Sequence, residues 1–102
     1  MEETLILSIH KKKKVNITFN SHEKGTITRQ CIPFDIGPSR RFKDGENRYH
    51  FYDLDSPNGS HNLSILPRQL INIELLSEGF NPADYITWQT NWYIKRDWGV
   101  YS

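Results

Sequence analysis

The chain has 102 residues, 25% of them charged, a net charge of +1 and one cysteine. This length fits a single domain over residues 1–102 with one modest core, and the lone Cys31 excludes an internal disulfide or a cysteine zinc cluster. Residues 1–51 hold ten Lys and Arg against six Asp and Glu, whereas residues 52–102 hold three against six. Such an asymmetry can orient a partner, but it is more often simply surface composition.

The first element is expected within residues 1–13, as a short helix or an extended lead-in. Leu5, Ile6 and Ile9 share one helical face, and two glutamates at the start suit the positive end of a helix. A strand over residues 5–9 is the alternative. The apolar run is too short for a signal peptide and its basic residues follow it. With one cysteine and no membrane-length apolar run, we expect a cytoplasmic protein.

Five short strands are expected over residues 14–76. Val15, Ile17 and Phe19 alternate with polar residues, as in a half-buried strand, and a polar loop ending at Gly25 leads to a return strand. The strands are expected at residues 15–20, 26–32, 48–54, 61–66 and 70–76, with a helical turn at 67–69. This order favours a mainly β fold, a five-stranded SH3/Sm-like small barrel.

The stretch from Phe34 to Gly45 is expected to be an irregular, poorly ordered loop. Its Gly37-Pro38 pair and its terminal Asp-Gly pair are turn signals. Such a loop would hold Arg40 and Arg41 in solvent.

The alternation of the last two strands predicts which side chains fill the core. In the last strand Ile71, Ile73 and Leu75 share a face, which we expect to point inward, with Leu70 at the strand entrance. The expected core is completed by Val15, Ile17, Phe19, Leu63 and Ile65.

Residues 77–102 form a tryptophan-rich tail that is expected to pack on the barrel. Asn81 followed by Pro82 is typical of a helix start, but the tail also alternates like a strand, so both readings stay open. Trp88, Trp92 and Trp98 either complete the core or mark a surface for a protein partner.

The sequence lacks the patterns of the common catalytic and metal sites. Its four histidines are scattered, and the segment from Asp53 to Gly59 fails the register of a calcium loop. It has neither a Gly-rich phosphate loop nor a G-x-S-x-G motif. We therefore expect no catalytic residue, no bound metal and no cofactor.

Basic and aromatic residues in the first half suggest a binding surface. Cations that neutralise phosphates beside rings that stack on bases are typical of nucleic-acid sites. The expected binding residues are Arg29, Arg40, Arg41, Lys43, Arg48 and Tyr52, with Tyr52 as the exposed ring. A solvated charged face is the alternative.

Four segments also follow one another in a recognisable order. They are ILSIHKKKKVNITF, where a helix runs into a basic strand; Arg29 four residues before Pro33; RYHFYDLD; and NLSILPRQLINIELLSEGFNP, which holds Phe80 and Pro82. From about Leu5 to Pro82 the chain resembles the WYL domain, a small SH3/Sm-like barrel of bacterial transcriptional regulators. Tyr49-His50-Phe51 stands near the place of the family's Trp-Tyr-Leu triplet.

The resemblance implies a stand-alone, sensor-type barrel that binds a nucleotide or nucleic acid, with Arg29 as the position that carries over. Together with the basic and aromatic residues, it predicts a non-catalytic binding module of regulatory type, for a nucleotide or single-stranded nucleic acid. The alternative function is a protein-interaction module that uses the tryptophan tail.

Overall fold

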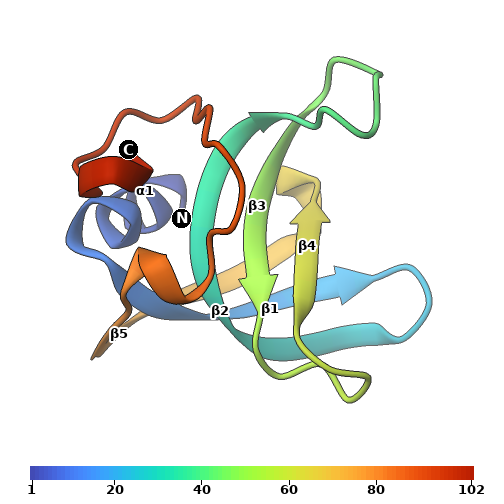
Figure 1. Ribbon diagram of the computed structural model, residues 1–102. Helices are drawn as coiled ribbons and strands as arrows, with labels where there is room; N and C mark the ends of the chain where they lie inside the picture. Colours follow the sequence, from blue (N-terminus) through green and yellow to red (C-terminus); the bar gives the residue numbers. More distant parts are fainter.

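The computed structural model describes residues 1–102 and is mainly β, as predicted (Figure 1). Its elements are helix α1 (Glu2–Lys11), strands β1 (Lys13–Ser21), β2 (Gly25–Pro38), β3 (Asn47–Asp53), β4 (His61–Ile65) and β5 (Leu70–Gly79), and the 3₁₀ turns η1 (Pro67–Gln69), η2 (Pro82–Asp84) and η3 (Gly99–Tyr101). No helix is long and apolar enough to cross a membrane.

The five strands form one open antiparallel sheet in the order β4-β3-β2-β1-β5. The predicted closed barrel is therefore wrong, because β4 and β5 remain the two edges and no ladder joins them. The Gln69 side chain of η1 links the end of β4 to β1. It accepts from the Leu66 N–H at 2.8 Å and donates to the Asn20 carbonyl at the end of β1 at 3.0 Å.

Helix α1 forms where it was expected and covers one side of the sheet (Figure 1). Leu5 and Ile9 are completely buried, and Glu2 and Glu3 occupy the first turn, where carboxylates are favoured. The helix ends at Lys11, and the left-handed backbone of the capping residue Lys12 turns the chain directly into β1.

The β1–β2 hairpin supplies the centre of the core. Val15 and Ile17 are fully buried and Phe19 nearly so, which confirms the predicted alternation. Val15 of β1 faces Cys31 of β2 across the ladder. Burial raises the pKa of the Cys31 thiol well above its ordinary range.

Strand β2 continues well beyond its expected end. The first five residues of the predicted loop, Phe34 to Pro38, belong to this strand, and Phe34 and Asp35 are buried. Pro33 fits inside the strand because pairing with β1 ends at Cys31, and a register shift follows Pro33 in the pairing with β3. Only residues 39–46 form the loop, where Arg40 and Arg41 are exposed as expected.

In β5 the predicted burial of Ile73 is confirmed, and the predicted burial of Ile71 is wrong. Ile73 and Leu70 are buried, but Ile71 is 53% exposed. The reason is an irregularity in the β1–β5 pairing between Thr18 and Phe19, which lets both Leu70 and Ile73 point inward. Such a bulge breaks strict alternation.

The tail is neither the long helix nor the strand that the sequence allowed. Asn81 caps η2 by accepting from the Ala83 N–H at 3.1 Å, but the helix stops after one 3₁₀ turn. From there the chain crosses in front of β2 and returns to α1 (Figure 1). Trp98 is 3% exposed, and its indole N–H donates to the Ile9 carbonyl at 2.9 Å. The tail therefore completes the core.

Candidate functional site

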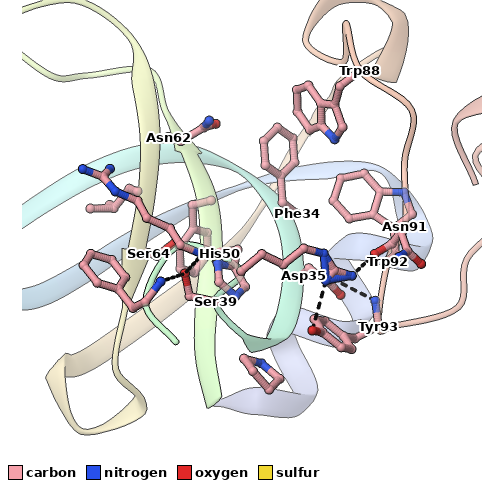
Figure 2. Close-up of a pocket in the computed structure, with 16 residues that line it drawn as sticks. Phe34, Asp35, Ser39, His50, Asn62, Ser64, Trp88, Asn91, Trp92 and Tyr93 are labelled. Carbon is pink, nitrogen blue, oxygen red and sulfur yellow. Dashed lines mark hydrogen bonds between the residues drawn. The ribbon is translucent and has the colours of Figure 1, made fainter. Parts of the chain in front are cut away.

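The largest cavity, of about 550 Å³, opens between the tail and the β2–β3 loop (Figure 2). We call residues 88–94 its tail wall and residues 39–46 its loop wall. Phe34 of β2 and His50 of β3 lie at its base, and Asn62 and Ser64 of β4 line a third side.

The tail wall presents aromatic rings to the cavity. Trp88 is 45% exposed, and its ring meets Phe34 edge-on at 5.8 Å between centroids. The ring centroid of Trp92 lies 5.7 Å from that of Phe34 and 6.3 Å from that of Trp88. Of the seven large hydrophobic residues that are exposed in the chain, three line this one cavity: Phe42, Trp88 and Tyr93. Clustering of that kind marks a binding surface more than scattered exposure does.

A buried ion pair fixes the tail wall to the sheet. Asp35 of β2 accepts from the N–H groups of Tyr93 and Ile94, each at 2.9 Å, and from Arg96 at 3.2 Å. The Arg96 side chain is fully buried and donates to the Phe34 carbonyl. Its guanidinium carbon lies 4.2 Å from the centroid of the Trp92 ring. Burial lowers the pKa of Arg96 to about 10, so it stays charged at neutral pH and neutralises Asp35.

The loop wall leaves positive charge without an acidic partner. Arg40 stacks on Tyr93 with its guanidinium carbon 4.6 Å from the ring centroid, and it donates to the Tyr93 hydroxyl at 3.0 Å and the Asn91 carbonyl at 2.6 Å. Both partners are neutral. The Arg41 guanidinium lies 5.5 Å from the Phe42 ring centroid and makes neither a hydrogen bond nor an ion pair. Asp35 is the only acidic side chain lining the cavity, so the site carries net positive charge.

A polar chain runs along the base of the cavity. The two ring nitrogens of His50 lie 2.7 Å from the Ser64 hydroxyl and 2.8 Å from the Gly37 carbonyl. Ser64 and Asn62 are exposed, so both can meet a ligand.

The structure brings only part of the predicted site to this cavity. Arg40 and Arg41 line it, and Lys43 is exposed in the same loop without lining it. Arg48 is instead held by a bidentate pair with Asp44, at 2.9 Å for each bond. This pair lowers the pKa of Asp44 to about 2.

Two other predicted site residues lie elsewhere. Tyr52 is half-buried between Phe34 and Tyr85, with centroid distances of 6.1 and 5.6 Å. Arg29 donates to the Asp55 carbonyl at 2.7 Å and its side chain is 12% exposed. It sits towards the far end of β3, away from the loop wall.

Several cavity residues were not singled out from the sequence. Asn62 and Ser64 lie two apart on β4, so simple alternation could have placed them on one face. His50 was predicted only to be one of four scattered histidines, yet it faces Ser64 in the ladder. Trp88 was predicted to complete the core or to mark a partner surface, but nothing in the sequence indicates that it lies opposite β4.

No cluster of three or more His, Cys, Asp or Glu side chains that could hold a metal ion forms in the structure. No protein-family model matches the chain, and no curated protein sequence does either.

Proposed function

We propose that the protein is a non-catalytic binding module for a nucleotide unit, either free or within a single strand of nucleic acid. The observation that carries this proposal is the joining, in one cavity, of the exposed Trp88 ring and the uncompensated charges of Arg40 and Arg41. An indole offers a stacking face to any base, and a guanidinium pairs with phosphate.

The size and charge of the cavity support the same class of ligand. About 550 Å³ falls within the range of roughly 300–1,000 Å³ for small-molecule sites. Its single lining carboxylate, Asp35, is already neutralised by Arg96, so no free negative charge opposes an anion.

The Ser64–His50 pair does not lead us to propose an enzyme. A hydrolytic serine–histidine pair is oriented by a carboxylate that stabilises the imidazolium. Here the second ring nitrogen of His50 meets the neutral Gly37 carbonyl, which provides no such charge. We therefore assign this pair to ligand recognition.

Kinship with WYL domains remains a proposal, and binding at the cavity does not depend on Arg29. A protein-interaction surface on the tail would have Trp88 as its main indole, because Trp98 is buried and Trp92 half-buried.

The test is a titration with AMP, CMP and a short single-stranded oligonucleotide at low salt, followed by Trp fluorescence and calorimetry. Trp88→Ala should weaken binding by roughly fivefold or more, because a base–aromatic stack contributes about 1–3 kcal/mol. Arg41→Ala should weaken it by about tenfold, as expected for loss of a charge-assisted hydrogen bond. Binding should also fall as salt rises.

Arg68→Ala is the matched control, because Arg68 is an exposed arginine outside the cavity and its loss should leave affinity unchanged. Affinity that rises with strand length would identify nucleic acid as the source, and equal affinity for mononucleotides would identify a free nucleotide. Absence of binding by all three probes at low salt would overturn the proposal.

A further inference from the structure

The polar side of the cavity faces its aromatic rings. Figure 2 shows Asn62 and Ser64 on the strand side and Trp88 on the tail, with Phe34 between them. The Asn62 side chain makes no hydrogen bond within the protein, and the Ser64 hydroxyl bonds only to His50. A planar ligand stacked on the rings would present its edge to these two side chains.

The direction of the hydrogen bonds at Ser64 follows from the Gly37 carbonyl. A carbonyl can only accept, so His50 Nε2, 2.8 Å away, must carry the hydrogen and donate it. In a neutral imidazole the other nitrogen, Nδ1, is then an acceptor. Ser64 lies 2.7 Å from Nδ1, so its hydroxyl donates its single hydrogen there.

The consequence is that Ser64 has no hydrogen left for a ligand. Its oxygen can only accept from a group in the cavity. The free amide of Asn62, two residues away on the same face of β4, supplies donors and a further acceptor. This edge therefore matches a ligand that presents an N–H donor beside an acceptor.

We propose that this edge selects adenine and cytosine, which carry an amino group at C6 and C4 respectively, over their keto counterparts. The inference rests on the proposed nucleotide function. The amino group would donate to Ser64 Oγ, and the adjacent ring nitrogen would accept from the Asn62 amide. Hypoxanthine and uracil place a carbonyl where the amino group stands, so two acceptors would face each other at Ser64. Sites built to hydrogen-bond one group reject analogues that leave it unpaired.

The experiment compares AMP with IMP and with purine riboside 5′-monophosphate, which lacks the amino group, and CMP with UMP, at pH 8. The wild type should bind AMP about fivefold more tightly than either analogue, the scale of one lost hydrogen bond. CMP should bind more tightly than UMP by a similar factor. Ser64→Ala should reduce AMP affinity to that of purine riboside monophosphate, which should itself bind as before.

A second variant reverses the hydrogen bonding without removing Ser64. In His50→Phe the hydroxyl has no acceptor on the protein, so it can donate to a carbonyl, and IMP and UMP should bind more tightly than they do to the wild type. Ser77→Ala, at an exposed serine on the opposite edge strand, is the matched control and should change no ratio.

The outcomes separate this inference from the proposal beneath it. Loss of the AMP preference in Ser64→Ala supports both. Nucleotide binding with equal affinity for amino and keto bases, or a preference that survives Ser64→Ala, overturns the inference and leaves nucleotide binding standing. No binding by any mononucleotide overturns the inference together with a free-nucleotide function.

Discussion

The tail wall and the loop wall of the cavity are attached to the sheet in different ways. The tail wall is held by Asp35, which bonds to Tyr93, Ile94 and Arg96, some 60 residues away along the chain. The loop wall is held mostly by short-range bonds, and by Arg40, which donates to Tyr93 and Asn91 of the tail wall. Ser39 accepts from the N–H groups of residues 41 and 42, and Asp44 pairs with Arg48 four residues on.

Because of this difference, we expect the two walls to have different roles. A stacking surface benefits from rings fixed by buried, long-range bonds, because less side-chain entropy is lost when a ligand binds. A phosphate contact tolerates movement, because a charge acts over distance and a long arginine can adjust. Loss of the buried Asp35–Arg96 anchor of the tail wall should therefore reduce stability most, and changes in the loop wall should reduce it less.

The largest effect is expected from breaking the buried pair. Arg96→Ala leaves the Asp35 carboxylate buried without its cation, and removal of one partner of such a pair typically costs about 3–5 kcal/mol. Urea unfolding should register this loss. The control is Arg68→Ala, whose pair with Glu46 is exposed at 3.7 Å and should change stability by no more than about 0.5 kcal/mol. Equal midpoints for the two variants would contradict the comparison.

The next effect concerns the sheet that carries both walls. Ile73→Ala should cost about 2–5 kcal/mol, because a buried side chain is removed and leaves a cavity. Ile71→Ala, two residues earlier on β5, removes the same atoms from an exposed position and should cost less than about 1 kcal/mol. Chemical melts of the pair test the bulge directly, since strict alternation would give them similar costs.

A smaller effect is expected where β2 touches the tail wall. A Cβ on Gly37 would come closer than 3.0 Å to three atoms of the Tyr93 ring. Gly37→Ala should therefore destabilise by about 1–3 kcal/mol, as overpacking does. In a Tyr93→Ala background the same change should cost under about 0.5 kcal/mol, and a double-mutant cycle measures the difference. An additive cycle would show that the ring does not pack against the strand.

The smallest effect belongs to the loop wall. The bidentate bonds from Arg48 lower the pKa of Asp44 from 3.8 to about 2. A depressed carboxyl pKa stabilises the fold above the unfolded value and loses that contribution as pH falls from about 4 through 2. Carboxyl carbon shifts in an NMR titration should show this low pKa, and Arg48→Ala should return it towards 3.8. An unchanged Asp44 titration in that variant would remove Arg48 as the cause.

Local patterns in the sequence predicted the local elements well. The helical turn at η1 follows from Pro67 between two apolar runs, and the alternation of Val15, Ile17 and Phe19 predicted their burial. Each of these signals lies within a few residues of the structure it specifies. The loop-wall arginines were found for the same reason, because breakers on both sides of Arg40 and Arg41 marked an exposed loop.

Features that depend on distant partners could not be predicted in this way. The bulge beside Ile71 arises from pairing with β1, and the strand conformation of Phe34 to Pro38 depends on β3 and on the tail. Nothing near Asp35 indicates that its partner is Arg96. Closure of the barrel was inferred from the number and order of the strands and the helical turn before the last one, whereas it depends on whether two edges meet.

Prediction of the cavity would have required both local patterns and distant partners. Its cations were visible as a local cluster, but its stacking ring and its polar edge come from Trp88 and from Asn62 and Ser64, far apart in sequence. Only the fold brings them together, because the tail crosses β2 opposite β4 (Figure 1).

The thiol at the centre of the sheet makes the molecule convenient to label. Cys31 is fully buried and is the only sulfhydryl in the chain, and its raised pKa keeps it protonated. A thiol-reactive dye added to native protein should therefore modify only molecules whose sheet has opened. The labelling rate then measures how often the sheet opens. A cysteine introduced on the surface could carry a fluorophore without Cys31 being removed.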